Sequence, residues 1–272
     1  MRRIGLMFQV VVIVLGLGLS MVAADEIWNS GNFSISGSVP AMGWNQTATT
    51  PFRLAMVDDF TLTAPADLTK LTIWGHMPGN TVQEPQVEQA FVRILTDIDG
   101  QPGDVIYGGW ETPLHFTETA TGFNQSGSSS SPIFRIEIDL GVMRLCPGTY
   151  WIQYNVDNDD IRPSTGTAIG NYFSQLATPA PPGANGRQMN VLNGQFFSLQ
   201  GNAPAFIIEG TLYEACATGG GDQDGDGLCT AADVPLFVTR LLSDTFHGCA
   251  DANGDCVADG RDVQAFVNCV GS

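Results

Sequence analysis

Basic residues are scarce in this chain, which has 11 Lys and Arg against 28 Asp and Glu and a formal net charge of −17. A protein that binds nucleic acid needs a basic surface to neutralise phosphates, and docking on an anionic membrane has the same requirement. We therefore expect neither nucleic acid nor a membrane surface as a partner. Apolar residues are not lacking, because 43% of the chain is hydrophobic, and this content excludes global disorder.

Long apolar runs are also lacking, apart from one at the start of the chain. Val10 to Leu19 follows the basic residues Arg2 and Arg3 and precedes small residues at positions 22–24. This order is typical of a secretory signal peptide, which we expect to span residues 1–24. A transmembrane anchor is the alternative, but the run is shorter than the ~20 residues that a span requires. We expect the mature chain to have no membrane span and to be secreted, either extracellular or at the cell surface.

Recognisable catalytic motifs are absent. Neither a metal-binding HExxH pattern nor a GxSxG nucleophile turn occurs, so we interpret His76 and His115 as surface or loop residues. Two short aspartate clusters could bind a cation, but their context favours a hairpin tip for the first and a solvated loop for the second. The clusters are Asp97, Asp99 and Asp104, and Asp157, Asp159 and Asp160.

A helical period is missing between residues 25 and 216, where apolar and polar residues alternate instead. Residues 134–140, 150–156 and 206–213 follow this pattern, which predicts half-buried strands. Shorter strand candidates are 60–62, 71–74 and 91–95, and turn residues such as Asp99-Gly100 separate the segments. We therefore predict a mainly β domain over residues 25–216, an antiparallel β-sandwich that is jelly-roll-like.

Part of this domain is similar to a broad set of secreted bacterial β-sandwich domains. The similarity rests on the segments 57–62 (VDDFTL), 71–73 (LTI), 93–97 (RILTD) and 100–103 (GQPG). The domains in question carry an F-x-L strand and a G-x-P-G hairpin. The resemblance implies a fold but no activity.

The C-terminal region contains two copies of one acidic loop. Residues 222–233 place Asp at positions 1, 3, 5 and 12 of a twelve-residue loop, with Gly227 at position 6, and the pattern recurs in residues 251–262. Calcium takes six to eight oxygens, and this spacing can wrap them around one ion, with a backbone carbonyl at position 7. The predicted ligands of two Ca²⁺ ions are Asp222, Asp224, Asp226, Leu228, Thr230 and Asp233, and Asp251, Asn253, Asp255, Val257, Asp259 and Asp262.

An apolar helical period follows each loop. Val234, Phe237, Val238 and Leu241 recur at helical spacing after the first loop, and Val263, Phe266, Val267 and Val270 do so after the second. Thr230 and Asp233 form a capping pair at the expected start of the first helix. A solvated acidic tail is the alternative interpretation, but two loops in register, each with a matching helix behind it, favour calcium binding.

This tandem resembles a dockerin, a calcium-loading loop-helix module that binds cohesin receptors. A Gly-rich stretch, predicted to be a linker over residues 217–221, replaces the entering helix of a full EF-hand, and both loops end in Asp. For residues 222–272 the resemblance implies calcium, and a cohesin-like or other cell-surface protein as partner. Loop positions 10 and 11 would recognise that partner, and they hold Ala231, Ala232, Gly260 and Arg261. Because the two pairs differ, we do not expect a symmetric, two-way docking mode.

Cysteine is absent before Cys146, and four of the six cysteines fall in the last 44 residues. An even number in an exported chain predicts disulfides, and the rival interpretation, zinc, has no CxxC pair to support it. We expect Cys146–Cys216 across the β domain. Of three connectivities within the C-terminal module we favour Cys229–Cys256 with Cys249–Cys269, which would tie the sixth position of the second loop, where Cys256 replaces Gly. The linker alone would then join the two parts flexibly, over ~12 Å.

Three functions remain open at this point. The first is a secreted, non-catalytic β protein with a calcium-dependent docking module. The second is a polysaccharide-acting glycoside hydrolase or a carbohydrate-binding component, because dockerins accompany such proteins. For this case Trp74, Trp151 and Tyr213, at polar positions of predicted strands, form the expected glycan platform, with burial in the core as the alternative. The third is a structural cell-surface protein.

Overall fold

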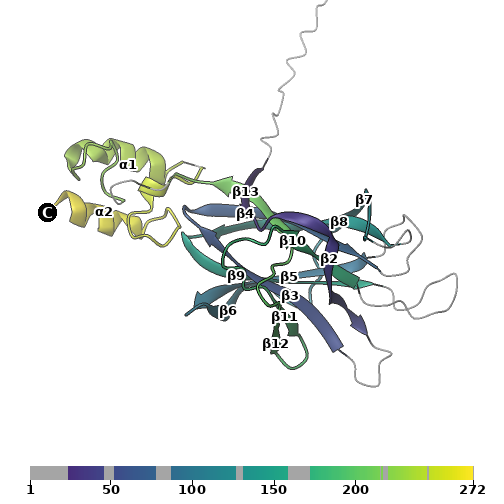
Figure 1. Ribbon diagram of the computed structural model, residues 1–272. Coiled ribbons are helices and arrows are strands. Elements are labelled where there is room, and N and C mark those ends of the chain that lie inside the picture. Colours follow the sequence, from purple (N-terminus) through teal and green to yellow (C-terminus); the bar gives the residue numbers. More distant parts are fainter. Residues whose placement is uncertain are drawn as a thin grey trace, which may run out of the picture.

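The computed structural model describes residues 24–45, 52–77, 87–126, 131–158, 172–214, 216, 220–243 and 245–271. The expected signal peptide lies outside these residues, apart from Ala24. The chain is mainly β, and its strands precede two short helices (Figure 1). The strands are β1 (Asp25–Asn29), β2 (Asn32–Asn45), β3 (Phe52–Leu62), β4 (Ala66–His76), β5 (Val87–Ile98), β6 (Gln101–Gly108), β7 (Phe116–Asn124), β8 (Pro132–Leu145), β9 (Gly148–Asn158), β10 (Tyr172–Thr178), β11 (Arg187–Asn190), β12 (Gln195–Ser198) and β13 (Phe206–Leu212).

The strands form two antiparallel sheets. In the first sheet the order is β1-β13-β4-β8-β7, and β10 extends the β13 edge of β4. In the second sheet the order is β3-β9-β5-β6, and the β11–β12 hairpin adds to β3. Strand β2 pairs with β10 of the first sheet and β3 of the second, so it joins the two. Antiparallel pairing throughout confirms this part of the sequence prediction.

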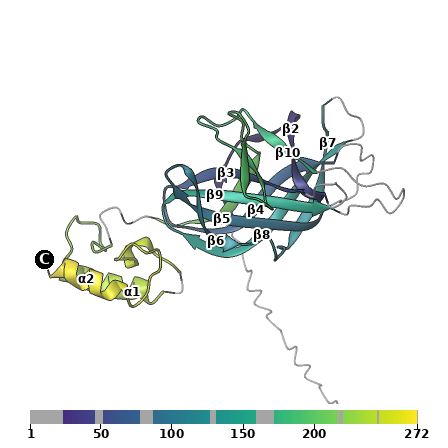
Figure 2. The same ribbon diagram turned by 90° about the horizontal axis from the view of Figure 1, so that it is seen from below.

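One apolar core lies between the two sheets. Its buried members include Ile136 and Ile138 of β8 in the first sheet, and Ile152, Tyr154 and Val156 of β9 in the second. A single cluster that draws on both sheets means that the sheets pack face to face in a sandwich-like arrangement (Figure 2). The alternation of the sequence predicted these strands because every second residue of each one points into this core.

Asp97 and Asp99 of the first aspartate cluster lie at a hairpin tip, as the Gly-Pro-Gly context predicts, whereas Asp104 lies within β6. Asp99 and Gly100 join β5 to β6, and both have positive φ, 54° and 72°. The carboxylate of Asp97 accepts a hydrogen bond from the Gly100 N–H at 3.1 Å and so closes the turn. In the second cluster Asp157 belongs to β9, and the other two members lie outside the described residues.

Two helices follow the sheets at one end of the molecule (Figures 1 and 2). They are α1 (Val234–Leu241) and α2 (Asp262–Val270), and short 3-10 turns, η1 (Ala231–Asp233) and η2 (Gly248–Ala250), lie ahead of each. The Thr230 side chain and Asp233 form the predicted capping box. Phe237 of α1 and Phe266 of α2 stack with ring centroids 3.9 Å apart, so the two helices share one small core. Within the described part of the chain, no helix is long and apolar enough to cross a membrane.

Candidate metal centre

The first acidic loop gathers three carboxylates. Oxygens of Asp222, Asp224 and Asp226 lie within 4.8 Å of one another. Ligands on opposite sides of a calcium ion are separated by about twice the 2.3–2.6 Å metal–oxygen distance, so this spacing fits one ion. Each of the three side chains also accepts an N–H of its own loop, and Asp222 accepts two, from Gly225 at 2.7 Å and Gly227 at 2.8 Å. The loop is therefore folded around its carboxylates.

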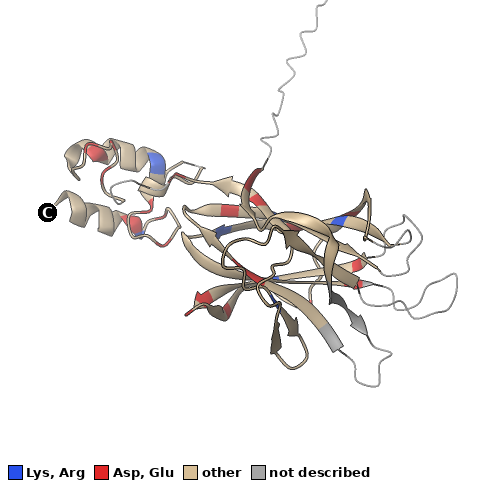
Figure 3. Cartoon of the chain, viewed as in Figure 1, with Lys and Arg blue, Asp and Glu red and all other residues tan. Residues whose placement is uncertain are grey.

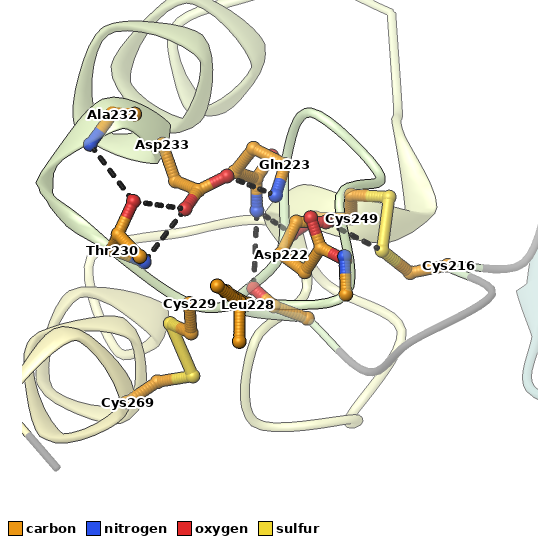
Figure 4. Close-up of a disulfide and its surroundings, with 12 residues drawn as sticks. Cys216, Asp222, Gln223, Leu228, Cys229, Thr230, Ala232, Asp233, Cys249 and Cys269 are labelled. Atoms are coloured by element: carbon orange, nitrogen blue, oxygen red, sulfur yellow. Dashed lines mark hydrogen bonds between the residues drawn. A yellow bond between two sulfur atoms is a disulfide. The ribbon is translucent and has the colours of Figure 1, made fainter.

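Asp233 closes the first loop from its twelfth position (Figure 4). Its side chain is fully buried. One carboxylate oxygen accepts the N–H groups of Gln223 and Asp224 at 2.6 and 3.1 Å, and the other accepts the Thr230 N–H at 2.7 Å. These donors, chiefly that of Thr230, hold the pKa of the Asp233 carboxyl below its ordinary value. The residue is thus held ionised beside the other acids.

The second loop repeats this arrangement. Asp251 accepts N–H groups from Asp255 at 2.9 Å and Cys256 at 2.8 Å, and the bond from Cys256 matches that from Gly227 to Asp222 in the first loop. Asp262 is fully buried and accepts the N–H groups of Asn253 and Asp259, at 3.1 and 2.7 Å. Burial raises the pKa of the Asp251 carboxyl, and the N–H donors oppose that shift. The sequence repeat is therefore also a repeat of hydrogen bonds.

Cys256 occupies the glycine position of the second loop and takes the backbone conformation of a glycine. Its φ is 60°, in the left-handed region, and φ is 88° at the equivalent Gly227. The sequence predicted a disulfide here, but with the wrong partner. Cys256 is bonded to Cys146, which lies in the turn between β8 and β9, and the two Cα atoms are 5.5 Å apart. The β domain therefore holds this turn of the loop.

All three predicted pairings are wrong. Besides Cys146–Cys256, the structure contains Cys216–Cys249 and Cys229–Cys269, with Cα separations of 4.7 and 5.8 Å (Figure 4). The error has one cause: the prediction kept the bridges within each part of the chain. In fact two of the three join the end of the β domain to the C-terminal module, one at the turn from β8 to β9 and one beyond β13.

The structure describes the predicted linker only at its last two residues. Residues 217–219 lie outside the described residues, but Gly220 and Gly221 pack tightly. A Cβ on Gly220 would collide with the backbone of Ala252, and one on Gly221 would collide with the sulfurs of Cys229 and Cys269. These glycines therefore permit close packing within the module. Two disulfides cross the segment in addition to the chain itself.

An aromatic contact reinforces this junction. Phe246 of the module is 8% exposed and meets the Tyr213 ring edge-on, with centroids 5.1 Å apart. The Arg144 guanidinium lies 4.2 Å from the centre of the Phe246 ring. Asp67 holds Arg144 by two hydrogen bonds of 2.8 Å and also accepts the Tyr213 hydroxyl at 2.6 Å. This contact could not be predicted from the sequence, in which only Tyr213 stands out.

The predicted glycan platform is wrong. Trp151 is fully buried on the outer face of the second sheet, where its Nε1 donates to Asp97 at 2.7 Å and Arg187 lies over its ring. Trp74 belongs to the first sheet, is 8% exposed and stacks on Phe33 at 5.5 Å. Tyr213 serves the junction with the module. The three side chains thus lie in three separate environments. For the two tryptophans the alternative interpretation, burial in the core, is correct.

The two histidines of the β domain differ. His115 is exposed, as predicted. His76 is not a surface residue: it is 4% exposed, contacts the Gln175 side chain at 2.6 Å, and has its pKa lowered to about 4 by burial. A neutral buried imidazole of this kind is part of the core.

Gln223, which belongs to no recognised sequence pattern, connects the first loop to α1. Gln223 at loop position 2 is 3% exposed, and its amide donates to the Cys249 carbonyl at 2.6 Å. Arg240 of α1 donates to the Gln223 carbonyl and side chain at 2.6 and 3.0 Å. Position 2 carries no metal ligand in the loop pattern, so this role could not be predicted from the sequence.

The charges of the molecule are mostly acidic over both parts, with few basic side chains (Figure 3). The predicted partner-recognition residues Ala231, Ala232, Gly260 and Arg261 are all exposed at the starts of the two helical segments. Arg261 bonds Asp259 at 2.8 Å and lies 3.5 Å from Asp255.

Comparison with known proteins adds no identity: neither a scan against protein-family models nor a search of curated proteins finds a match.

Proposed function

We propose that this chain is a secreted, non-catalytic β protein whose C-terminal module, dockerin-like in its residues, binds two calcium ions and docks on a cohesin-type or other cell-surface protein. One observation carries the proposal: two loops of the same hydrogen-bonded form each bury their first and last carboxylates. Asp222, Asp233, Asp251 and Asp262 are all at most 8% exposed. Buried carboxylates of one loop repel one another, as Asp262 acts on Asp251, and a bound cation would offset that repulsion.

The residues present fit calcium in the first loop. Three carboxylates bring oxygens together at one point, the loop pattern assigns the backbone carbonyl of Leu228 at position 7 as a further ligand, and hard oxygen ligands suit a hard divalent cation. In the second loop Asn253 replaces one Asp, so this site has one negative charge fewer at position 3. Asp259 at position 9 restores that charge, although it also forms an ion pair with Arg261 at 2.8 Å.

Apolar side chains that remain exposed on the two helices favour a protein partner. Phe237 and Phe266 turn inward, whereas their neighbours Val238 and Val267 are 46% and 54% exposed. Val234 and Val263 occupy matching positions one turn earlier and are exposed as well. The two helices therefore present equivalent apolar residues, as an interface centre would require. The partner-recognition pairs differ between the halves, which argues for docking in one orientation.

The remaining parts of the proposal rest on topology and cysteine chemistry. The orders β1-β13-β4-β8 and β3-β9-β5-β6 are those of a jelly roll, with β7 as an added edge strand, and we infer that fold for the β domain. Three disulfides favour an oxidising compartment. Together with the expected signal peptide they support secretion.

Calorimetric calcium titration of the oxidised full chain tests the metal sites. We expect two ions per chain, one for Asp233→Asn or Asp262→Asn, and none for the double variant. Asp104→Asn is the matched control, because this exposed aspartate belongs to the β6 strand and should leave both ions bound. Failure of the native chain to bind calcium, or full binding by the double variant, contradicts the proposal.

Docking is tested with a panel of recombinant cohesin modules and with surface proteins extracted from the source cells. A complex in size-exclusion chromatography should form with calcium and disappear with chelator. Val238→Glu and Val267→Glu should weaken it, whereas Val142→Glu, at a 75% exposed site on β8, should not. A complex that forms equally well in chelator rejects the calcium-dependent mode.

A further inference from the structure

A cleft of about 430 Å³ lies on the outer face of the second sheet, away from the calcium loops. Its floor is β5, one wall is the loop between β6 and β7, and the other wall is the tip of the β11–β12 hairpin. Its volume falls in the usual range of small-ligand sites, ~300–1,000 Å³. The residues that line it include Gln89, Phe91, Trp110, Glu111, Val191 and Leu192.

The loop between β6 and β7, the wall that carries Trp110, is held by close backbone packing. Gly108 pairs with Arg93 at the edge of β5 and has a φ of 74°, and a Cβ there would collide with the Val92 carbonyl oxygen. The chain returns to the same edge where the Leu114 N–H donates to the Ala90 carbonyl at 2.8 Å. The five residues between these anchors therefore leave the sheet as a short loop that carries Trp110 and Glu111.

Both walls are held in place. The Arg93 guanidinium lies 5.2 Å from the centre of the Trp110 ring. Burial lowers the pKa of Arg93, and a partly desolvated guanidinium interacts more strongly with an aromatic face. Opposite, the Asn190 side chain accepts the Leu192 N–H at 3.0 Å and its carbonyl accepts the Gly194 N–H at 2.8 Å. The cleft is thus formed before any ligand arrives.

We infer that this cleft binds a neutral saccharide. Sugar rings have apolar faces and hydroxyl edges. The indole of Trp110 with Leu192 and Val191 supplies apolar surface for the faces, and the Gln89 amide and Glu111 carboxylate supply hydrogen-bonding groups for the edges. The excess of acids over the whole chain, 28 against 11 basic residues, disfavours an anionic ligand. This inference does not rest on the calcium module.

The test uses the oxidised full chain with cellohexaose and xylohexaose as neutral probes and polygalacturonate as an acidic one. We expect at least one neutral hexasaccharide to bind in calorimetry, and the acidic polymer not to bind. Trp110→Ala and Leu192→Arg should each weaken binding at least about tenfold. The Leu192 variant alters a side chain that is 53% exposed, so it leaves the core intact. Trp110→Phe should retain part of the affinity.

Two controls separate this site from other causes. Phe123→Ala removes an exposed aromatic ring on β7, in the other sheet, and should bind as the native chain does. The double variant Asp233→Asn/Asp262→Asn should also bind normally, so a failure of the calcium proposal leaves this result untouched. The inference is overturned if no neutral probe binds, if only polygalacturonate binds, or if Leu192→Arg and Trp110→Ala both bind with native affinity.

Discussion

The β domain and the C-terminal module are stabilised by different means. Between the sheets, the core is almost wholly apolar, with residues such as Phe60, Leu71 and Phe206 fully buried. Among the described residues of the module, the large buried apolar side chains are three phenylalanines, and they are outnumbered by buried aspartates and Gln223. A region with so small a core needs other sources of stability, and here these are cross-links and, in our proposal, ions. The comparison teaches that a single chain can combine one part stabilised by hydrophobic burial with another whose stability depends on oxidising conditions and, in our proposal, on calcium.

The largest expected effect is separate unfolding of the module. In reductant and chelator together, the helices should lose their structure while the sheets remain folded, because carboxylate repulsion is then opposed neither by an ion nor by a cross-link. Hydrogen exchange with mass spectrometry measures both parts in one sample. We expect fast exchange in 222–243 and 251–271, and protection in β4, β8 and β9. The oxidised chain in chelator is the control and should keep partial protection. Equal protection of the helices with and without calcium in the reduced chain would refute this.

A somewhat smaller effect is expected from the module's own core. Phe237→Ala removes half of the stacked pair and should cost about 3–5 kcal/mol locally, whereas Ile138→Val between the sheets should cost about 0.5–1.5 kcal/mol. All five tryptophans lie in the β domain. Tryptophan fluorescence therefore reports that domain, and helical circular dichroism reports the module. Phe237→Ala should change only the second signal. A shift of the fluorescence transition as large as the loss of helix would mean that the two parts unfold together.

Mild acid should lower the folding stability of the β domain through His76. The pKa of His76 is about 4 in the folded chain against 6.5 when unfolded, so the unfolded state binds a proton more readily. Above pH 6.5 this residue makes no pH-dependent contribution to the free energy of unfolding. Between pH 6.5 and pH 4 the free energy of unfolding should fall by up to about 3 kcal/mol because of it. Denaturant melts followed by tryptophan fluorescence at several pH values measure it. His76→Gln should flatten the curve over this window, and an unchanged slope would show that other groups cause it.

The smallest expected effect is a difference between the two acidic loops in their proposed calcium affinity. In Cys146→Ser the second loop loses the bridge that holds Cys256 in its left-handed conformation, so its calcium affinity should fall about fivefold, or about 1 kcal/mol. The first loop has Gly227 and should be unaffected. Cys146→Ser/Cys256→Gly should restore the affinity, since glycine adopts this conformation freely. Calorimetry in an Asp222→Ala background isolates the second site, and no loss in Cys146→Ser would show that the bridge does not serve the loop.

What the sequence predicted well was local. The strands around Ile136 and Ile152 follow from a period of two, and the helices after Asp233 and Asp262 follow from a repeated spacing. Both patterns are complete within a short segment. The carboxylates of the two loops accept hydrogen bonds from their own loops, in agreement with their places in the twelve-residue pattern, because that pattern is also local. Calcium binding itself stays a prediction.

What the sequence did not predict depends on distant parts meeting. Trp151 occupies a polar-side position in its strand, yet Met189 and Arg187 of the β11–β12 hairpin cover it, from a segment far along the chain. The cysteine pairs failed likewise, since neither Cys146 nor Cys216 indicates that a second module lies against its strand. Only Cys256, in a glycine position, carried a local sign that a covalent bond holds the loop.

The two bridges between the parts also determine how the molecule would carry a mechanical load. A pull on the two helices would not run through residues 217–221 alone. One branch would enter at Cys146, in the turn where β8 of the first sheet leads into β9 of the second, and the other at Cys216, beyond β13. Tension would thus be shared by strands of both sheets. Two attachment points also suppress swivelling, so a tethered β domain would be held at a fixed angle to its anchor.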